Sequence, residues 1–207
     1  MNGYEEIIRG YLDKAWARSE EVLREAAPAV PEAPGVLAFP AFGRPCSVQR
    51  HGVFFDGVLD TGARGVLTAI YLAVVPKWSA PLHPLKAFKE IPNSGPYQAA
   101  FAVHAEQCLV PHVPKIRENL ESLLSSFSGH RNTDAPSGDF SFTLYPLPKI
   151  PLYYIVHEAD DEFPAAVTCL FGGDCPSFMP LDALADVAEY TARSLIGHGM
   201  GRHGALS

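Results

Sequence analysis

Residues 150–171 read "IPLYYIVHEADDEFPAAVTCLF", and this stretch decides the fold class. Two apolar runs, 151–156 and 163–171, are rich in β-branched and aromatic residues and flank an acidic segment at 158–162. Such runs are typical of strands, and a short polar segment between them is typical of a hairpin turn. The run "FSFTLY" at 140–145 alternates apolar and polar residues just before them. The three runs predict an antiparallel three-strand meander in the C-terminal third.

Helical periodicity dominates the rest of the chain, apart from an earlier hairpin predicted at 46–60 from its glycine turns. Apolar residues recur three and four positions apart in five segments: 3–26, 62–75, 96–109, from 111 or 114 to 127, and 181–196. Strands and helices do not alternate regularly. The sequence therefore predicts an α+β fold, in which an antiparallel sheet packs with about five helices.

Proline and glycine content suggests the domain organisation. Residues 1–28 are expected to be an N-terminal helix, and the proline-rich residues 27–45 an extended connector. Residues 29–197 form one predicted α+β domain, and the glycine-rich residues 198–207 a disordered tail.

Composition narrows the class of protein. The chain has 207 residues, of which 47% are hydrophobic and 19% charged, as in a globular protein with a sizeable core. The formal net charge is −7 and no dense Lys/Arg run occurs, so a nucleic-acid partner is not expected. The apolar run 66–75 is too short to span a bilayer, and the N-terminus does not look like a signal peptide. We therefore expect a cytoplasmic protein without a membrane partner.

A family resemblance rests on the stretch at 150–171 and on "FMPLDALADVAEYTARSLI" at 178–196. The middle of the chain, "AIYLAVV" at 69–75 and "PLKAFKEIPNSGPYQAAF" at 84–101, also contributes. Over residues 35–196 the chain resembles the bacterial and archaeal DUF3786 family. The resemblance implies a setting in anaerobic redox or one-carbon, corrinoid-linked metabolism, and it implies no particular activity or catalytic residue.

Some members of that family carry a cysteine-rich segment that looks like the iron–sulfur domain of corrinoid proteins. This chain has four cysteines, Cys46, Cys108, Cys169 and Cys175, and they form no close cluster in the sequence. We therefore expect no iron–sulfur cluster in this chain, and the sequence leaves any other cofactor unknown.

A long proline-rich loop at 76–95 is the first candidate site. It carries Trp78, His83, Lys86 and Phe88, and basic and aromatic side chains together suit an anionic planar ligand. Alternatively, the aromatic residues only pin the loop onto the core.

The acidic segment is the second candidate. Asp160, Asp161 and Glu162 offer carboxylate oxygens to a hard cation such as Mg²⁺ or Ca²⁺. Two structural interpretations stay open: the segment is a solvated hairpin tip, or one carboxylate accepts backbone N–H groups and shapes the turn.

Histidine and cysteine give the third candidate. His104 and Cys108 are spaced i, i+4 on a predicted helix, with His112 just beyond it, which would suit a transition metal. The alternative is a packed polar residue beside a buried thiol.

No P-loop, nucleophile-elbow or Rossmann glycine pattern is present in the sequence. The favoured hypothesis is a non-enzymatic accessory protein that binds a small ligand or cofactor, or a protein partner. One alternative is a metal-dependent hydrolase that uses the 158–162 carboxylates. Another is an assembly protein that docks through its N-terminal helix.

Overall fold

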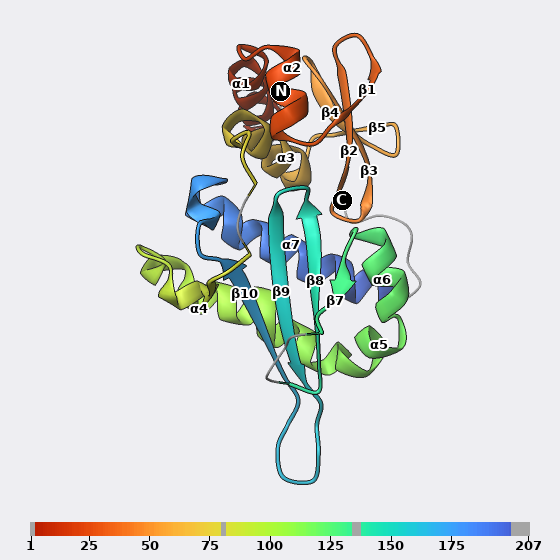
Figure 1. The fold of residues 1–207 in the computed structure, drawn as a ribbon, viewed down its shortest axis with the longest axis vertical. Helices are drawn as coiled ribbons and strands as arrows, with labels where there is room; N and C mark the ends of the chain where they lie inside the picture. The colour runs from red at the N-terminus through yellow and green to blue at the C-terminus, as the bar shows by residue number, and fades with distance from the viewer. Residues whose placement is uncertain (1–2, 80–81, 134–137, 200–207) are drawn as a thin grey trace.

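The fold is α+β, as predicted, and is built from two five-stranded antiparallel sheets with helices (Figure 1). The computed structural model describes residues 3–79, 82–133 and 138–199. The strand order is β1–β2–β3–β4–β5 in the N-terminal sheet and β6–β10–β9–β8–β7 in the C-terminal sheet. Buried apolar residues from both sheets and the helices form one continuous core.

The N-terminal sheet corrects the prediction of a connector at 27–45 and extends the hairpin predicted at 46–60. Its strands are β1 Val30–Ala33, β2 Val36–Ala41, β3 Arg44–Gln49, β4 Gly52–Phe55 and β5 Val58–Asp60. Alternate residues of β2, namely Leu37, Phe39 and Ala41, are buried. Burial of this apolar face therefore outweighs the proline content, which had suggested an extended connector.

The predicted meander is the centre of the C-terminal sheet. Its strands are β8 Phe140–Leu147, β9 Ile150–His157 and β10 Ala166–Gly172. Two short strands extend it on either side, β6 Leu85–Ala87 from the 76–95 loop and β7 His130–Arg131. Edge strands of three and two residues give too weak a periodicity to be recognised in the sequence.

The helices follow the predicted segments, with several interruptions. They are α1 Gly3–Trp16, α2 Glu20–Ala26, α3 Ala63–Val74, α4 Gln98–Phe101, α5 Val113–Glu118, α6 Leu120–Ser126 and α7 Leu181–Gly199. The segment 3–26 is two helices because the Ser19 side chain accepts a hydrogen bond from the Val22 N–H (3.3 Å) and caps α2. Helix α7 reaches two residues into the expected tail, and residues 200–207 lie outside the described residues.

Short helical turns of other types complete the chain. A π-helical turn at Ala102–Glu106 and a 3₁₀ helix at Gln107–His112 continue α4. Further 3₁₀ turns lie at Phe88–Glu90, Gly95–Tyr97 and Cys175–Ser177. The predicted helix 96–109 is thus irregular, which changes the directions in which its side chains point.

A buried lysine joins the two halves of the molecule. Lys149 lies in the turn between β8 and β9, whose tip reaches up beside α3 in Figure 1, and its side chain is buried, with the residue only 7% exposed. Its Nζ donates to the carbonyl oxygens of Lys77 (2.7 Å), Pro76 (3.0 Å), Trp78 (3.2 Å) and Glu25 (3.3 Å). One ammonium group therefore holds the end of α2 and the segment after α3 against the C-terminal sheet.

A second cation binds the same region. Arg18 donates to the carbonyl oxygens of Leu72 (3.1 Å) and Val75 (3.0 Å), at the C-terminal end of α3. Carbonyl groups at a helix end lack intrahelical partners and carry partial negative charge, so a cation there is stabilising. Helix α1 packs along α3 nearby and buries Leu12 and Ala15. The N-terminal helices are thus integral to the fold.

We expect Lys149→Met to lower the free energy of unfolding by about 3 kcal/mol, because buried carbonyl oxygens would lose a charged donor. Lys77→Met is the matched control. Lys77 forms an ion pair with Glu25 (2.7 Å), but both side chains are about half exposed to solvent, so we expect its loss to change the free energy of unfolding much less than the loss of Lys149. Urea unfolding of both variants measures the difference, and equal losses would contradict this account of Lys149.

Candidate functional site

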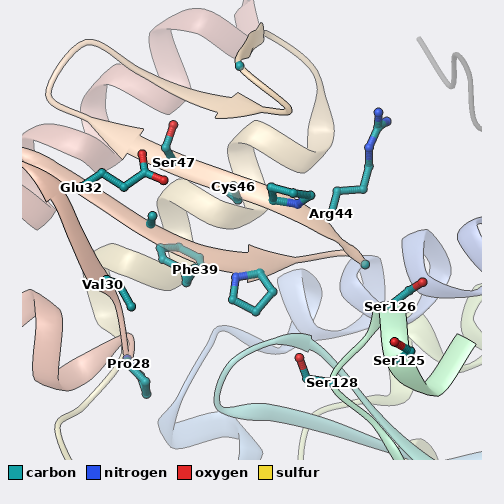
Figure 2. A pocket seen from close by; sticks show the side chains of 15 residues that line it. Pro28, Val30, Glu32, Phe39, Arg44, Cys46, Ser47, Ser125, Ser126 and Ser128 are labelled. Atoms are coloured by element: carbon teal, nitrogen blue, oxygen red, sulfur yellow. The ribbon is translucent and has the colours of Figure 1, made fainter.

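A cavity of about 600 Å³ opens between the outer face of the N-terminal sheet and the C-terminal end of α6 (Figure 2). Part of its lining is apolar and comes from the segment after α2 and from β1, β2 and β3: Pro28, Val30, Ala38, Phe39, Pro40 and Pro45. The other part carries hydroxyl groups from β3 and from the end of α6: Ser47, Ser125, Ser126 and Ser128.

Strand register explains why the outer face of the sheet is hollow here. Ala38 of β2 pairs with Val30 of β1 on one side and with Ser47 of β3 on the other. Directly paired residues project from the same face of an antiparallel sheet. The small side chains of Ala38 and Ser47 therefore lie side by side on this face, where larger ones would fill the space.

The opposite wall is set by the contact between the β2–β3 turn and α6. Gly43 in that turn has φ +74°, and a Cβ atom built on it would lie 2.8 Å from Cε2 of Phe127, the residue that caps α6. A larger residue would therefore push the turn away from α6. Hydrogen bonds from Phe42 N–H to Pro146 O (2.6 Å) and from Tyr145 N–H to Phe127 O (3.1 Å) fix the same junction.

Two charged residues line the cavity among the residues that the structure describes, Glu32 and Arg44. Arg44 forms an ion pair with Asp56 (2.5 Å), so its charge is largely compensated. Glu32 lies on β1 and is exposed, and within the described ranges it forms no ion pair. The cavity thus combines apolar surface, hydroxyl groups, one uncompensated carboxylate and the buried thiol of Cys46, whose pKa is raised by burial.

The four residues singled out in the 76–95 loop lie elsewhere. Phe88 is 2% exposed and its ring stacks on Phe101 at 4.2 Å, so it belongs to the core. Trp78 is 50% exposed, and its ring meets that of Phe178 edge-on at 4.5 Å. His83 is exposed and Lys86 is partly buried on β6. The two aromatic contacts favour the interpretation in which this loop is pinned onto the core.

The acidic segment forms the exposed end of the long β9–β10 hairpin, which projects beyond the rest of the molecule in Figure 1. Oδ1 of Asp160 accepts hydrogen bonds from the N–H groups of Phe163 (2.7 Å) and Glu162 (2.8 Å). These bonds lower the pKa of the Asp160 carboxyl. Asp160 therefore shapes the turn, while Asp161 and Glu162 are exposed beside it.

The residues of the proposed transition-metal set do not lie on one regular α-helix. His104 lies in the π-helical turn and Cys108 in the 3₁₀ helix, so the i, i+4 spacing of an α-helix does not apply. The Cys108 thiol donates to the His104 carbonyl oxygen (3.0 Å). Across the described ranges, no group of three or more His, Cys, Asp or Glu side chains is arranged to hold a metal ion, His112 and the 158–162 carboxylates included.

The sequence analysis did not single out Glu106, a carboxylate in the same π-helical turn as His104. Its Oε1 accepts a hydrogen bond from the Cys169 N–H (2.9 Å) on β10. The partner strand β6 pairs with β10 only from Leu170 onward, so Glu106 satisfies the backbone group that β6 leaves unpaired. Burial raises the pKa of the Glu106 carboxyl, and the hydrogen bond opposes this shift. Glu106 thus pairs with a backbone donor of β10 at the point where β6 begins.

A family model described as a domain of unknown function, DUF3786, matches residues 23–194. The chain belongs to the DUF3786 family. This confirms the resemblance found in the sequence, and the match covers both sheets and the cavity. No curated protein and no solved structure matches this DUF3786 chain. Within the described residues, none of its helices has the length and hydrophobicity to cross a membrane.

The cavity of this DUF3786 protein could not be found from the sequence, because residues 27–45 supply most of one wall and were interpreted as a connector. A signal was present in those residues. Leu37, Phe39 and Ala41 alternate with more exposed residues, and the dipeptide Phe42-Gly43 follows them as a turn. That pattern indicates a strand and a hairpin despite the prolines.

The turn role of Asp160 predicts a pH effect confined to the hairpin end. Because hydrogen bonds lower the folded-state pKa of Asp160, the ionised form stabilises the turn, and this stabilisation is lost as pH falls through that pKa. At neutral pH, Asp160→Ala should speed amide exchange at Glu162 and Phe163, and the difference from the unmodified protein should vanish in acid. Exchange measured by NMR tests this, with Asp161→Ala as the control.

A titration of the unmodified protein with Ca²⁺ or Mg²⁺ tests the alternative, in which the hairpin end binds a cation. Joint movement of the carboxylate signals of Asp160, Asp161 and Glu162 at low cation concentration would show that the hairpin end binds a cation. The turn interpretation predicts no saturable change.

Proposed function

We propose that this DUF3786 protein is a non-enzymatic binding protein that holds a small organic molecule in the cavity beside β1, β2, β3 and α6. The observation that supports this proposal most strongly is the presence of the cavity. Its volume of about 600 Å³ is typical of ligand pockets, which span about 300 to 1,000 Å³. Apolar surface with a few polar groups is also the usual lining of such pockets, because the former supplies affinity and the latter orientation.

The chemistry of the lining supports binding without catalysis. A serine hydroxyl becomes a useful nucleophile when a base such as histidine or lysine lies within hydrogen-bond reach. Neither residue type lines the cavity within the described residues, although Ser47, Ser125, Ser126 and Ser128 are all present. These hydroxyl groups can orient a bound molecule through hydrogen bonds.

The free edge of the sheet favours a small molecule over an added peptide strand. Strand β1 is the edge beside the cavity, and it contains Pro31, which has no N–H group to donate. Its register with β2 also shifts between Pro31 and Ala33. Proline and irregular register are features that protect an edge from pairing with another strand.

The two alternative functions receive less support from the geometry. The carboxylates required by a hydrolase lie at the exposed hairpin end, away from the residues that line the cavity. The N-terminal helix α1 packs on α3, which leaves it less available as a docking arm. The metabolic setting, anaerobic redox or one-carbon metabolism, rests on the family resemblance and stays a prediction.

A pair of tryptophan substitutions tests the cavity. Ser47 and Gln49 lie two residues apart on β3 and project from the same partly buried face. Ser47 lines the cavity, whereas Gln49 is not among the described residues that line it. We expect Ser47→Trp to fill the cavity and weaken binding of the neutral fluorescent probe dansylamide about tenfold, a loss of about 1.4 kcal/mol. Gln49→Trp should bind as tightly as the unmodified protein.

Probe fluorescence measures the affinities, and urea unfolding shows whether both variants retain their stability. If dansylamide shows no saturable binding to the unmodified protein, or binds equally to both folded variants, the cavity is not the ligand site.

A further inference from the structure

We infer that the ligand of this cavity is an organic cation, an ammonium or guanidinium group attached to an apolar body; the inference rests on the function proposed above. The chemical class of the ligand follows from the charged side chains around the cavity, one of which has an ion-pair partner and one of which does not.

The two charged residues that line the cavity differ in whether they have a partner. The guanidinium of Arg44 is held by the carboxylate of Asp56 at 2.5 Å, so an anionic ligand would have to compete with a partner already in place. The carboxylate of Glu32 has no such partner in the described part of the chain. Figure 2 shows Glu32 on β1 and Arg44 at the start of β3, well separated along the sheet. The free charge at the cavity is therefore negative.

The end of α6 adds acceptors on the opposite side. The helix ends at Ser126, and carbonyl groups of its last turn already accept hydrogen bonds from the backbone N–H groups that follow, so the acceptors available here are side-chain hydroxyl groups. The hydroxyl groups of Ser125, Ser126 and Ser128 lie at this end and can accept hydrogen bonds from N–H donors. An ammonium group carries three donors and no acceptor, so it suits both walls.

The floor between these walls is hydrocarbon. Ala38, Pro40 and Pro45 present side chains that cannot form hydrogen bonds, and Pro40 pairs directly with Pro45 across β2 and β3. An apolar body that covers them removes their surface from water, which is favourable. The net charge of −7 also raises the local concentration of cations around the whole protein.

Two matched fluorescent probes, one cationic and one neutral, test whether the cavity prefers a cation. Dansylcadaverine has a dansyl group, an apolar chain and a primary amine, whereas its N-acetylated derivative keeps the first two and is neutral. We expect the unmodified protein to bind the amine about threefold more tightly, the size typical of one partly exposed ion pair. Added salt should reduce this preference.

Glu32→Gln should remove the preference for the amine and leave affinity for the acetylated probe unchanged. Glu21→Gln, which removes the same charge from an exposed position on α2, is the control and should keep the preference. Equal binding of the two probes, or a preference that survives Glu32→Gln, would overturn the inference.

The outcomes separate this inference from the proposed function. If both probes bind equally and Ser47→Trp weakens both, the cavity is a ligand site without selection for cations. If an anionic probe such as anilinonaphthalene sulfonate binds more tightly than the amine and Arg44→Gln removes that binding, the inference is wrong and Arg44 selects the ligand. If no probe binds, the proposed function fails as well.

Discussion

The buried ammonium group of Lys149 is the contact on which the arrangement of the two sheets depends. It stands in the β8–β9 turn of the C-terminal sheet, and its partners are carbonyl oxygens at the end of α2 and in the segment after α3. A buried cation without its donors satisfied would be costly, so these carbonyl groups must keep their positions. The hairpin tip and the N-terminal helices are therefore fixed relative to each other.

The segment held by Lys149 leads directly into the residues that line the cavity. The carbonyl group of Glu25 belongs to the last turn of α2, and Pro28 and Val30, which follow directly, line one side of the cavity. The other side is held by the packing of the Gly43 turn on Phe127. The cavity thus lies between two rigid junctions, which is the preorganisation that a binding site requires.

Much of the fold followed from periodicity, because long regular elements carry strong patterns. The alternation at 140–145 and the apolar runs on either side of 158–162 gave the three central strands, and helical spacing gave α3 and α7. The family assignment was also accessible from the sequence. The short edge strands β6 and β7 carry too few residues for a pattern, so they were not predicted.

The candidate site was not predictable, because its walls come from residues that are roughly 80 to 100 positions apart in the sequence. Nothing near Ser125 indicates that it faces Pro40, and only the fold brings them together. Lys149 gave no signal either, since a lysine in a hairpin turn is normally exposed. The π-helical and 3₁₀ turns between 102 and 112 changed the face on which His104 and Cys108 lie, which a regular helical wheel could not foresee.

The most direct test is to locate a bound probe by NMR. The amide signals of the ¹⁵N-labelled protein would be followed during a titration with dansylcadaverine. The account predicts that the largest shifts gather at Val30, Ala38, Ser47 and Ser126, which lie around the cavity on four elements of the chain, β1, β2, β3 and α6. Shifts centred on the 76–95 loop or on the end of the β9–β10 hairpin would place the binding site elsewhere and contradict the account.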